Sequence, residues 1–265
     1  KDIDRIKDVP YQELYNAGQR AMAASIGTRR PGTPMMWGFG PTPDGEVVLQ
    51  QPFQPGFADI SSNVPLLIGT TFNELQRLNY NRNITLEQAR TELQRTFADE
   101  TDAYIDAFAE AYPDYTPQDL LSIDWLFRPK TIITADYVAK SRKAKTYTYM
   151  FTWRSPINKG SVHGNELNFC FNTLERAGNE LPQPTEQDYE LADIMSSVWA
   201  QFAKTGNPNI KELPKWKAYT AKNGEMMIFD YNCEIRNNPD RKLEEIIDRH
   251  CFKQLDEFRK KQAGK

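Results

Sequence analysis

The chain has 265 residues, and its charges nearly cancel: 33 Lys and Arg stand against 36 Asp and Glu, for a net charge of −3. This balance argues against nucleic acid as a partner, since phosphate binding needs an excess of basic residues on one face. No stretch approaches the roughly 18–20 consecutive apolar residues that a membrane-spanning helix needs. The length fits about two average domains or one large α/β domain.

The first half of the chain predicts helices around one buried strand. Helical spacing of apolar residues covers roughly the first 26 positions, and Pro43-Asp44-Gly45 is a strong turn signal further on. The run 64–69, Val-Pro-Leu-Leu-Ile-Gly, is typical of a strand buried on both faces in a parallel sheet. Thr85 and Gln88 have the spacing of a capping box. Helices are expected over residues 85–98, 101–111 and 130–142.

The second half alternates strands and helices. Residues 145–153 are aromatic and β-branched, which predicts a strand, and 226–229 predict a shorter one. A helix over 186–204 should end at Gly206, and a last helix is expected over 239–262. The class is therefore α/β, and we interpret residues 1–265 as one domain. Because so few strands would leave long open edges, the sheet is expected to need strands from elsewhere.

Few residues could bind a metal. The cysteines are Cys170, Cys233 and Cys251, no C-x-x-C pair occurs, and the histidines are His163 and His250. A structural zinc site needs four close nitrogen or sulfur ligands, so we predict no metal site. The chain opens Lys-Asp-Ile-Asp-Arg without an initiator Met or an apolar signal region, so we expect it to begin within a longer protein or after processing.

Two polar residues follow the predicted strands where open α/β sheets place their ligands. Glu74 comes just after the first strand, and His163 lies in a glycine-flanked loop about ten residues past the next one. An acid followed by a histidine is the second part of the Ser…Asp/Glu…His order of α/β-hydrolases. There the histidine takes the serine proton, and the carboxylate holds the imidazole in the right tautomer.

Six segments in a fixed order carry a family resemblance. They are residues 41–45 (PTPDG), 64–74 (VPLLIGTTFNE), 124–129 (DWLFRP), 163–171 (HGNELNFCF), 199–209 (WAQFAKTGNPN) and 251–252 (CF). Together they resemble the C-terminal half of the type-B carboxylesterases, the family of the cholinesterases and the bacterial para-nitrobenzyl esterases. The resemblance implies a partial α/β-hydrolase fold, with Glu74 as the acid and His163 as the base of a catalytic triad that acts on small carboxylic esters. It implies neither a metal nor an organic cofactor. Family members are often exported, so it also implies secretion or a periplasmic location.

The sequence departs from the family pattern in two ways. Leu75 stands where the family usually has glycine, and no G-x-S-x-G or HGGG-type motif occurs. In the family both missing motifs precede the acid. We therefore expect the nucleophilic serine to lie outside this chain, the absent N-terminal half to be its partner, and the isolated chain to be inactive.

The resemblance also admits another class of protein. Cholinesterase-like adhesion proteins keep the fold while losing triad members, so a non-catalytic binding protein is the alternative. The residue at the nucleophile position of the missing G-x-S-x-G motif would distinguish the two: serine in the enzyme, another residue in the binding protein. Glu166 matches a buried family glutamate, for which we expect a structural role as a hydrogen-bond acceptor. Phe169 and Phe171 are expected in the core rather than in an acyl pocket.

Overall fold

The computed structural model describes residues 3–26, 43–49, 59–75, 84–141 and 143–252, in two compact units. One unit comprises residues 1–50 with 251–265, and the other comprises residues 51–250. We describe each unit by itself.

The N-terminal unit contains a helix that is shorter than expected. A 3-10 helix, Ile3–Asp8, precedes α1, Tyr11–Ile26. The predicted single helix is therefore wrong, because Pro10 has no N–H with which to continue a helical ladder. The predicted turn is confirmed: the Asp44 carboxylate accepts three backbone N–H bonds of 2.9 Å, and Gly45 has a φ of 80°.

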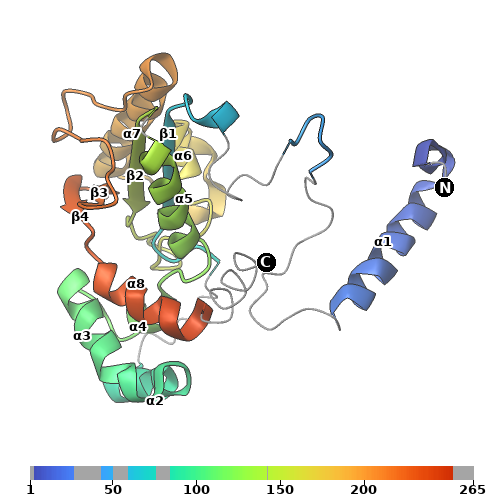
Figure 1. Cartoon of the computed structure of the whole chain (residues 1–265). Helices are drawn as coiled ribbons and strands as arrows, with labels where there is room; N and C mark the ends of the chain where they lie inside the picture. The colour runs from blue at the N-terminus through green and yellow to red at the C-terminus, as the bar shows by residue number, and fades with distance from the viewer. Residues whose placement is uncertain (1–2, 27–42, 50–58, 76–83, 142, 253–265) are drawn as a thin grey trace. The chain divides into compact units, whose positions relative to one another are not determined.

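The larger unit is built on a four-stranded sheet in the order β1-β2-β3-β4 (Figure 1). The strands are β1 (Leu66–Thr71), β2 (Thr146–Phe151), β3 (Glu225–Phe229) and β4 (Glu234–Asn237). β1, β2 and β3 are parallel, whereas β4 runs antiparallel to β3. The parallel strands fall where the sequence predicted them. The carboxyl ends of the three parallel strands therefore meet at one edge of the sheet.

Seven helices belong to this unit in the described part of the chain. They are α2 (Leu86–Phe97), α3 (Thr101–Ala111), α4 (Asp119–Ser122), α5 (Arg128–Ser141), α6 (Leu167–Cys170), α7 (Glu186–Thr205) and α8 (Arg241–Ile247). The capping box of Thr85 and Gln88 opens α2, and Gly206 closes α7 with a φ of 68°. Short 3-10 turns cover Asp59–Ser61, Ala98–Glu100, Leu174–Arg176 and Gly178–Glu180.

The last predicted helix is present as α8, which continues into a π-helical turn at Asp248–Phe252. Residues 253–265, which the prediction partly covered, lie outside the described residues. None of the helices described above or elsewhere in the described ranges is long and apolar enough to cross a membrane.

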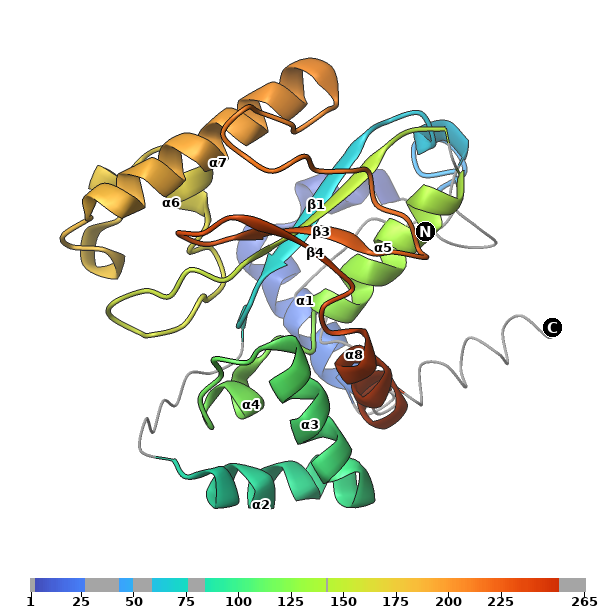
Figure 2. The ribbon, with the colours of Figure 1, turned by 90° about the vertical axis from the view of Figure 1, so that its left-hand side faces the viewer.

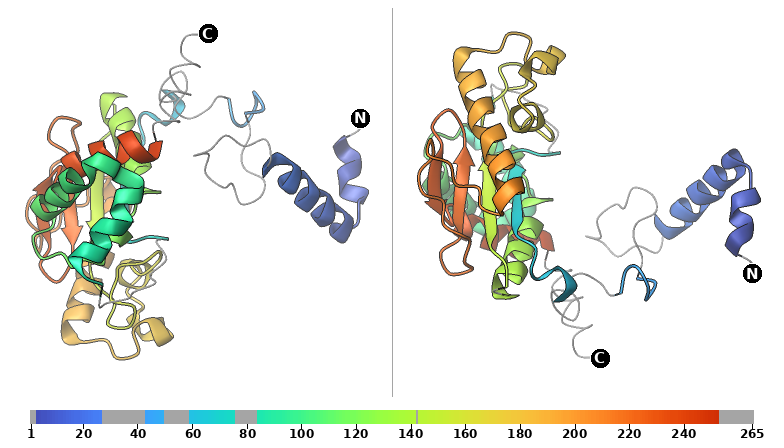
Figure 3. Two further views of the ribbon diagram at one scale, coloured as in Figure 1. Left: turned by 90° about the horizontal axis from the view of Figure 1, so that it is seen from below. Right: turned by 90° about the horizontal axis from the view of Figure 1, so that it is seen from above.

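Helices cover both faces of the sheet. α7 packs on one face and α5 on the other (Figure 2). The main core lies on the α7 side, where Tyr147, Phe151 and Phe229 of the sheet contact a cluster that includes Met195 and Val198 of α7. α2, α3 and α8 group together at one end of the unit (Figure 3). The two-sided covering explains why every residue of β3, and every residue of β2 except the half-buried Tyr149, is buried.

A buried ion pair joins three of these helices. The Arg128 guanidinium, at the start of α5, donates to both carboxylate oxygens of Asp240 over 2.7 and 2.8 Å. Both side chains are almost fully buried, and the Tyr112 hydroxyl also donates to Asp240 over 2.8 Å. Glu244 of α8 lies 3.6 Å from Arg128 Nε. Burial, assisted by the negative charge of Asp240, raises the pKa of Glu244 to about 8.

This raised pKa predicts that Glu244→Gln increases the free energy of unfolding by an amount that depends on pH. Between pH 4.5, the ordinary value, and about 8, the unfolded chain releases a proton that the folded chain retains. The wild type should therefore lose stability relative to the variant as the pH rises through this window, with no further change above it. Urea denaturation at several pH values from 4.5 to 8.5 measures the difference. The control is Glu245→Gln at the exposed neighbouring position, whose unfolding free energy should depend on pH as that of the wild type does. If the unfolding free energies of Glu244→Gln and the wild type change with pH in parallel, the prediction is contradicted.

Candidate active site

Glu74 lies in a tight turn directly after β1. Its carboxylate Oε1 accepts the backbone N–H of Thr71 over 2.7 Å, and its own N–H donates to the Thr71 hydroxyl over 3.0 Å. Glu74 adopts a φ of 44°, which is uncommon for a residue with a side chain. These reciprocal bonds fix the carboxylate at the carboxyl edge of the sheet, where only 8 % of the side chain is exposed.

His163 is brought to Glu74 by an extension of the sheet. Glu74 pairs with Val162 in an isolated parallel bridge, and the His163 N–H donates to the Glu74 carbonyl over 3.1 Å. The side chains then meet, with His163 Nδ1 2.5 Å from Glu74 Oε2. A proton on Nδ1 would bond the carboxylate and leave Nε2 to accept another proton. The imidazole is 60 % exposed, so it is open to a reacting group.

Asn73 and Ser161 clamp the two loops together. The Asn73 N–H donates to the Ser161 carbonyl over 2.9 Å, and the Ser161 N–H donates back to the Asn73 side chain over 2.7 Å. Asn73 Nδ2 also donates to the carbonyl of Ser122 over 2.8 Å. All three residues are buried. The separation of Glu74 and His163 therefore depends on a fixed backbone frame rather than on the pair alone.

Phe127 supports the imidazole from the start of α5. Its ring stacks on that of His163, with centroids 5.8 Å apart and planes at 12°. Phe127 is placed by Asp124, whose carboxylate accepts the N–H groups of residues 126–128 and whose own N–H donates to the Phe72 carbonyl. Burial raises the pKa of Asp124, and these N–H bonds oppose the rise. The sequence names Phe127 only within the segment 124–129 and predicts no contact with His163, although an Asp four residues before α5 signals the cap.

Glu166 lies near the pair. Burial raises the pKa of its carboxyl group, the charge of Glu74 raises it further, and His163 lowers it. Its Oε2 is buried and has no hydrogen-bond partner among the described residues. Phe169 is buried as expected, but the expectation of a core position for Phe171 is wrong, since this residue is 71 % exposed. α6 ends at Cys170, so Phe171 leaves the packed face of the helix.

Within the described ranges, no three His, Cys, Asp or Glu side chains gather in a way that could hold a metal ion. The described site contains an oriented imidazole and its carboxylate. Such a pair can remove a proton from a hydroxyl group and return it to a leaving group.

A partly parallel sheet with helices on both faces, and an acid and a histidine after successive strands, define the C-terminal part of an α/β-hydrolase. The structure is similar to that of an esterase from Clostridium hathewayi, with a TM-score of 0.78 and 27% identity, over 93% of this chain and 48% of that one. It is also similar to carboxylesterase Est55 of Geobacillus stearothermophilus, with a TM-score of 0.58 and 25% identity, over 92% of this chain and 50% of that one.

The sequence comparisons narrow the class to a family. The sequence model of the carboxylesterase family matches residues 3–246, and the chain belongs to this family. The chain is 30% identical over 218 residues to the para-nitrobenzyl esterase of Bacillus subtilis, a match that covers 76% of this chain and 41% of that protein. The chain thus spans about half the length of these relatives.

Proposed function

We propose that this chain is the acid- and base-bearing part of a serine carboxylic ester hydrolase that acts on small-molecule esters. Glu74 is the orienting acid and His163 the general base, and the serine lies outside the 265 residues. The observation that carries the proposal is the 2.5 Å contact of His163 Nδ1 with Glu74 Oε2, held by backbone bonds on both sides. The whole chain then belongs to one α/β-hydrolase domain.

The reaction follows from this geometry. His163 Nε2 takes the proton of the serine hydroxyl as the oxygen attacks the ester carbonyl, and the Glu74 carboxylate stabilises the imidazolium that forms. The imidazolium then gives this proton to the departing alcohol. In the second half of the reaction His163 takes a proton from water, whose oxygen attacks the acyl-serine carbonyl. His163 then returns the proton to the serine oxygen as the carboxylic acid is released. Backbone N–H groups outside the chain would stabilise the oxyanion.

One serine lies beside the histidine, but its environment disfavours a role as the nucleophile. Ser161 is 1 % exposed, and its hydroxyl donates to the Phe151 carbonyl over 2.8 Å. Attack by this hydroxyl would break its bond to Phe151 and would have to build a covalent intermediate in a space with almost no solvent access. This supports a nucleophile from another segment, with the missing N-terminal half as the partner.

Labelling with a fluorophosphonate serine probe, followed by denaturing intact-mass spectrometry, tests the assignment. We expect the 265-residue chain to remain unlabelled, and any second polypeptide that completes the enzyme to carry the label. The isolated chain should hydrolyse p-nitrophenyl butyrate no faster than the buffer blank, because triad members act as a unit. Label on this chain, or turnover that disappears in His163→Ala, would contradict the assignment of the serine to another segment.

A further inference from the structure

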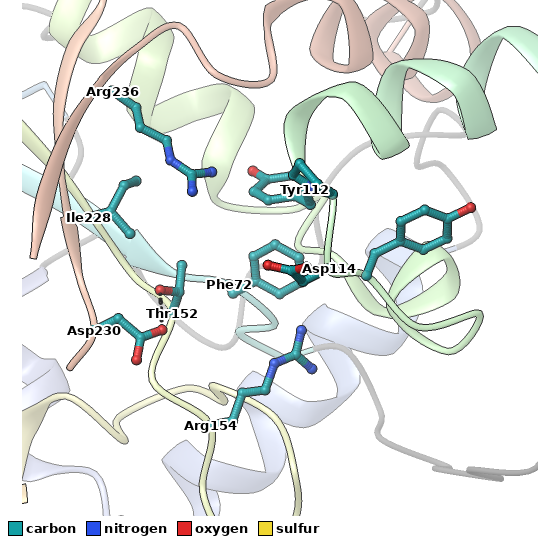
Figure 4. Close-up of a pocket in the computed structure, with 10 residues that line it drawn as sticks. Phe72, Tyr112, Asp114, Thr152, Arg154, Ile228, Asp230 and Arg236 are labelled. Atoms are coloured by element: carbon teal, nitrogen blue, oxygen red, sulfur yellow. Dashed lines mark hydrogen bonds between the residues drawn. The ribbon is translucent and has the colours of Figure 1, made fainter. Parts of the chain in front are cut away.

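A small pocket opens at the carboxyl edge of the sheet, and neither Glu74 nor His163 lines it. Phe72, Thr152 and Asp230, each the first residue after β1, β2 and β3, contribute to its wall (Figure 4). Its volume is about 190 Å³. Pockets for drug-sized ligands usually hold roughly 300–1,000 Å³, so this one suits a smaller molecule.

The pocket combines apolar walls with charges of both signs. Phe72 and Tyr112 meet edge to face, with centroids 4.9 Å apart, and Tyr115 and Ile228 extend the apolar surface. The charged residues of the wall are two arginines and two aspartates, Arg154, Arg236, Asp114 and Asp230. The two arginines reach toward the pocket from opposite sides (Figure 4). The charges of the wall thus sum to zero.

Carboxylates outside the wall hold both arginines in place. Arg154 donates to both oxygens of Asp119 over 2.8 and 3.1 Å, and Asp119 is fully buried. Arg236 donates to Glu234 over 2.6 Å and to the Ala111 carbonyl over 3.2 Å. A guanidinium has five N–H donors, so the bonds of Arg236 to Glu234 and Ala111 leave this group able to bind a further acceptor. Fixed donors reduce the ordering cost of binding.

One of the two acids is also fixed. Asp230 accepts the Thr152 hydroxyl on one oxygen and the Tyr231 N–H on the other, both over 2.8 Å. Asp114 is exposed beyond the end of α3. A carboxylate has about four acceptor positions, so Asp230 can bind a cationic donor while keeping these bonds.

We propose that this pocket binds a free α-amino acid with an apolar side chain. Its carboxylate would lie against Arg154 and Arg236, its ammonium group against Asp114 and Asp230, and its side chain on the aromatic wall. The cancelling charges favour a zwitterion over a ligand of one sign, because a lone anion meets both aspartates and a lone cation meets both arginines. This binding site is independent of ester hydrolysis.

Three ligands with the same side chain test the charge requirement: L-leucine, the anion N-acetyl-L-leucine and the cation L-leucinamide. Saturation-transfer NMR and calorimetry on the 265-residue chain at pH 6.5, where the amine of the amide is protonated, should detect leucine. The two singly charged analogues should bind at least about tenfold more weakly, which is roughly one lost charge-assisted hydrogen bond. Equal affinity for all three, or no binding of leucine, would overturn the proposal.

Two variants locate the site. Asp114→Asn and Arg236→Gln should each weaken leucine binding at least about tenfold. Their matched controls are Asp106→Asn and Arg90→Gln, at exposed positions that do not line the pocket, and these should bind leucine as the wild type does. Substitution of Arg154 is avoided because it would leave the buried Asp119 without its partner. If Arg236→Gln does not fold, Asp114→Asn decides; wild-type affinity in that variant would refute the site.

Discussion

Replacing Arg128 by Met should lower the free energy of unfolding by roughly 3–5 kcal/mol, the typical cost of removing one partner of a buried ion pair. The variant leaves the Asp240 carboxylate, which is 3 % exposed, without its counter-charge and without two hydrogen bonds. The Tyr112 hydroxyl alone cannot replace them. Urea denaturation at pH 7 measures the loss.

An exposed ion pair provides the control. Arg90 contacts Asp102 over 2.6 Å with both side chains more than half exposed, and Arg90→Met should cost at most about 1 kcal/mol. The double variant Arg128→Met, Asp240→Leu should recover part of the stability, since it removes both buried charges. Equal losses for Arg128→Met and Arg90→Met would show that the buried pair does not hold the helices together.

Glu74→Gln should reduce kcat of the complete enzyme, with its serine-bearing segment, by roughly 10⁴-fold, as expected when an imidazole is held in the wrong tautomer. The amide has almost the shape of the carboxylate and can still accept the Thr71 N–H. Its N–H₂ group, however, can donate to His163 Nδ1 and so place the imidazole proton on Nε2, where it blocks the acceptance of the serine proton.

Ester hydrolysis and the rate of fluorophosphonate labelling measure this effect together. Glu175→Gln, at an exposed position, is the matched control and should retain full activity. A thermal melt distinguishes a misfolded Glu74→Gln from an inactive one. Activity within tenfold of the wild type in a folded Glu74→Gln would remove Glu74 from the proposed mechanism.

Local signals predicted the elements that carry them. The capping box at Thr85 fixes the start of α2, and the left-handed Gly206 fixes the end of α7. The apolar run 64–69 predicted β1, and the aromatic and β-branched run 145–153 predicted β2. β4 was missed because Glu234–Asn237 is short and polar, and pairs only as an edge strand. Four-residue helices such as α4 and α6 are too short to show a period.

The sequence could predict those parts of the candidate site that come after the ends of strands. Glu74 and His163 stand where successive parallel strands finish, which the sequence alone can place. The contacts that fix their geometry depend instead on the register of β1 with β2 and on the approach of α5. The Asn73–Ser161 clamp and the stacking of Phe127 join residues 88 and 36 positions apart, so no local pattern marks them.

Because Glu74 is bridged to Val162, the spacing of the acid and the histidine does not depend on the length of the loop between β2 and Val162. Between β2 and the bridge the chain makes a bulge that closes on itself, with the Ser155 N–H bonded to the Gly160 carbonyl over 3.0 Å. Residues inserted between 156 and 159 would lengthen this bulge and leave the two side chains in contact. The length of this loop can therefore vary in evolution without changing the contact of the acid with the histidine.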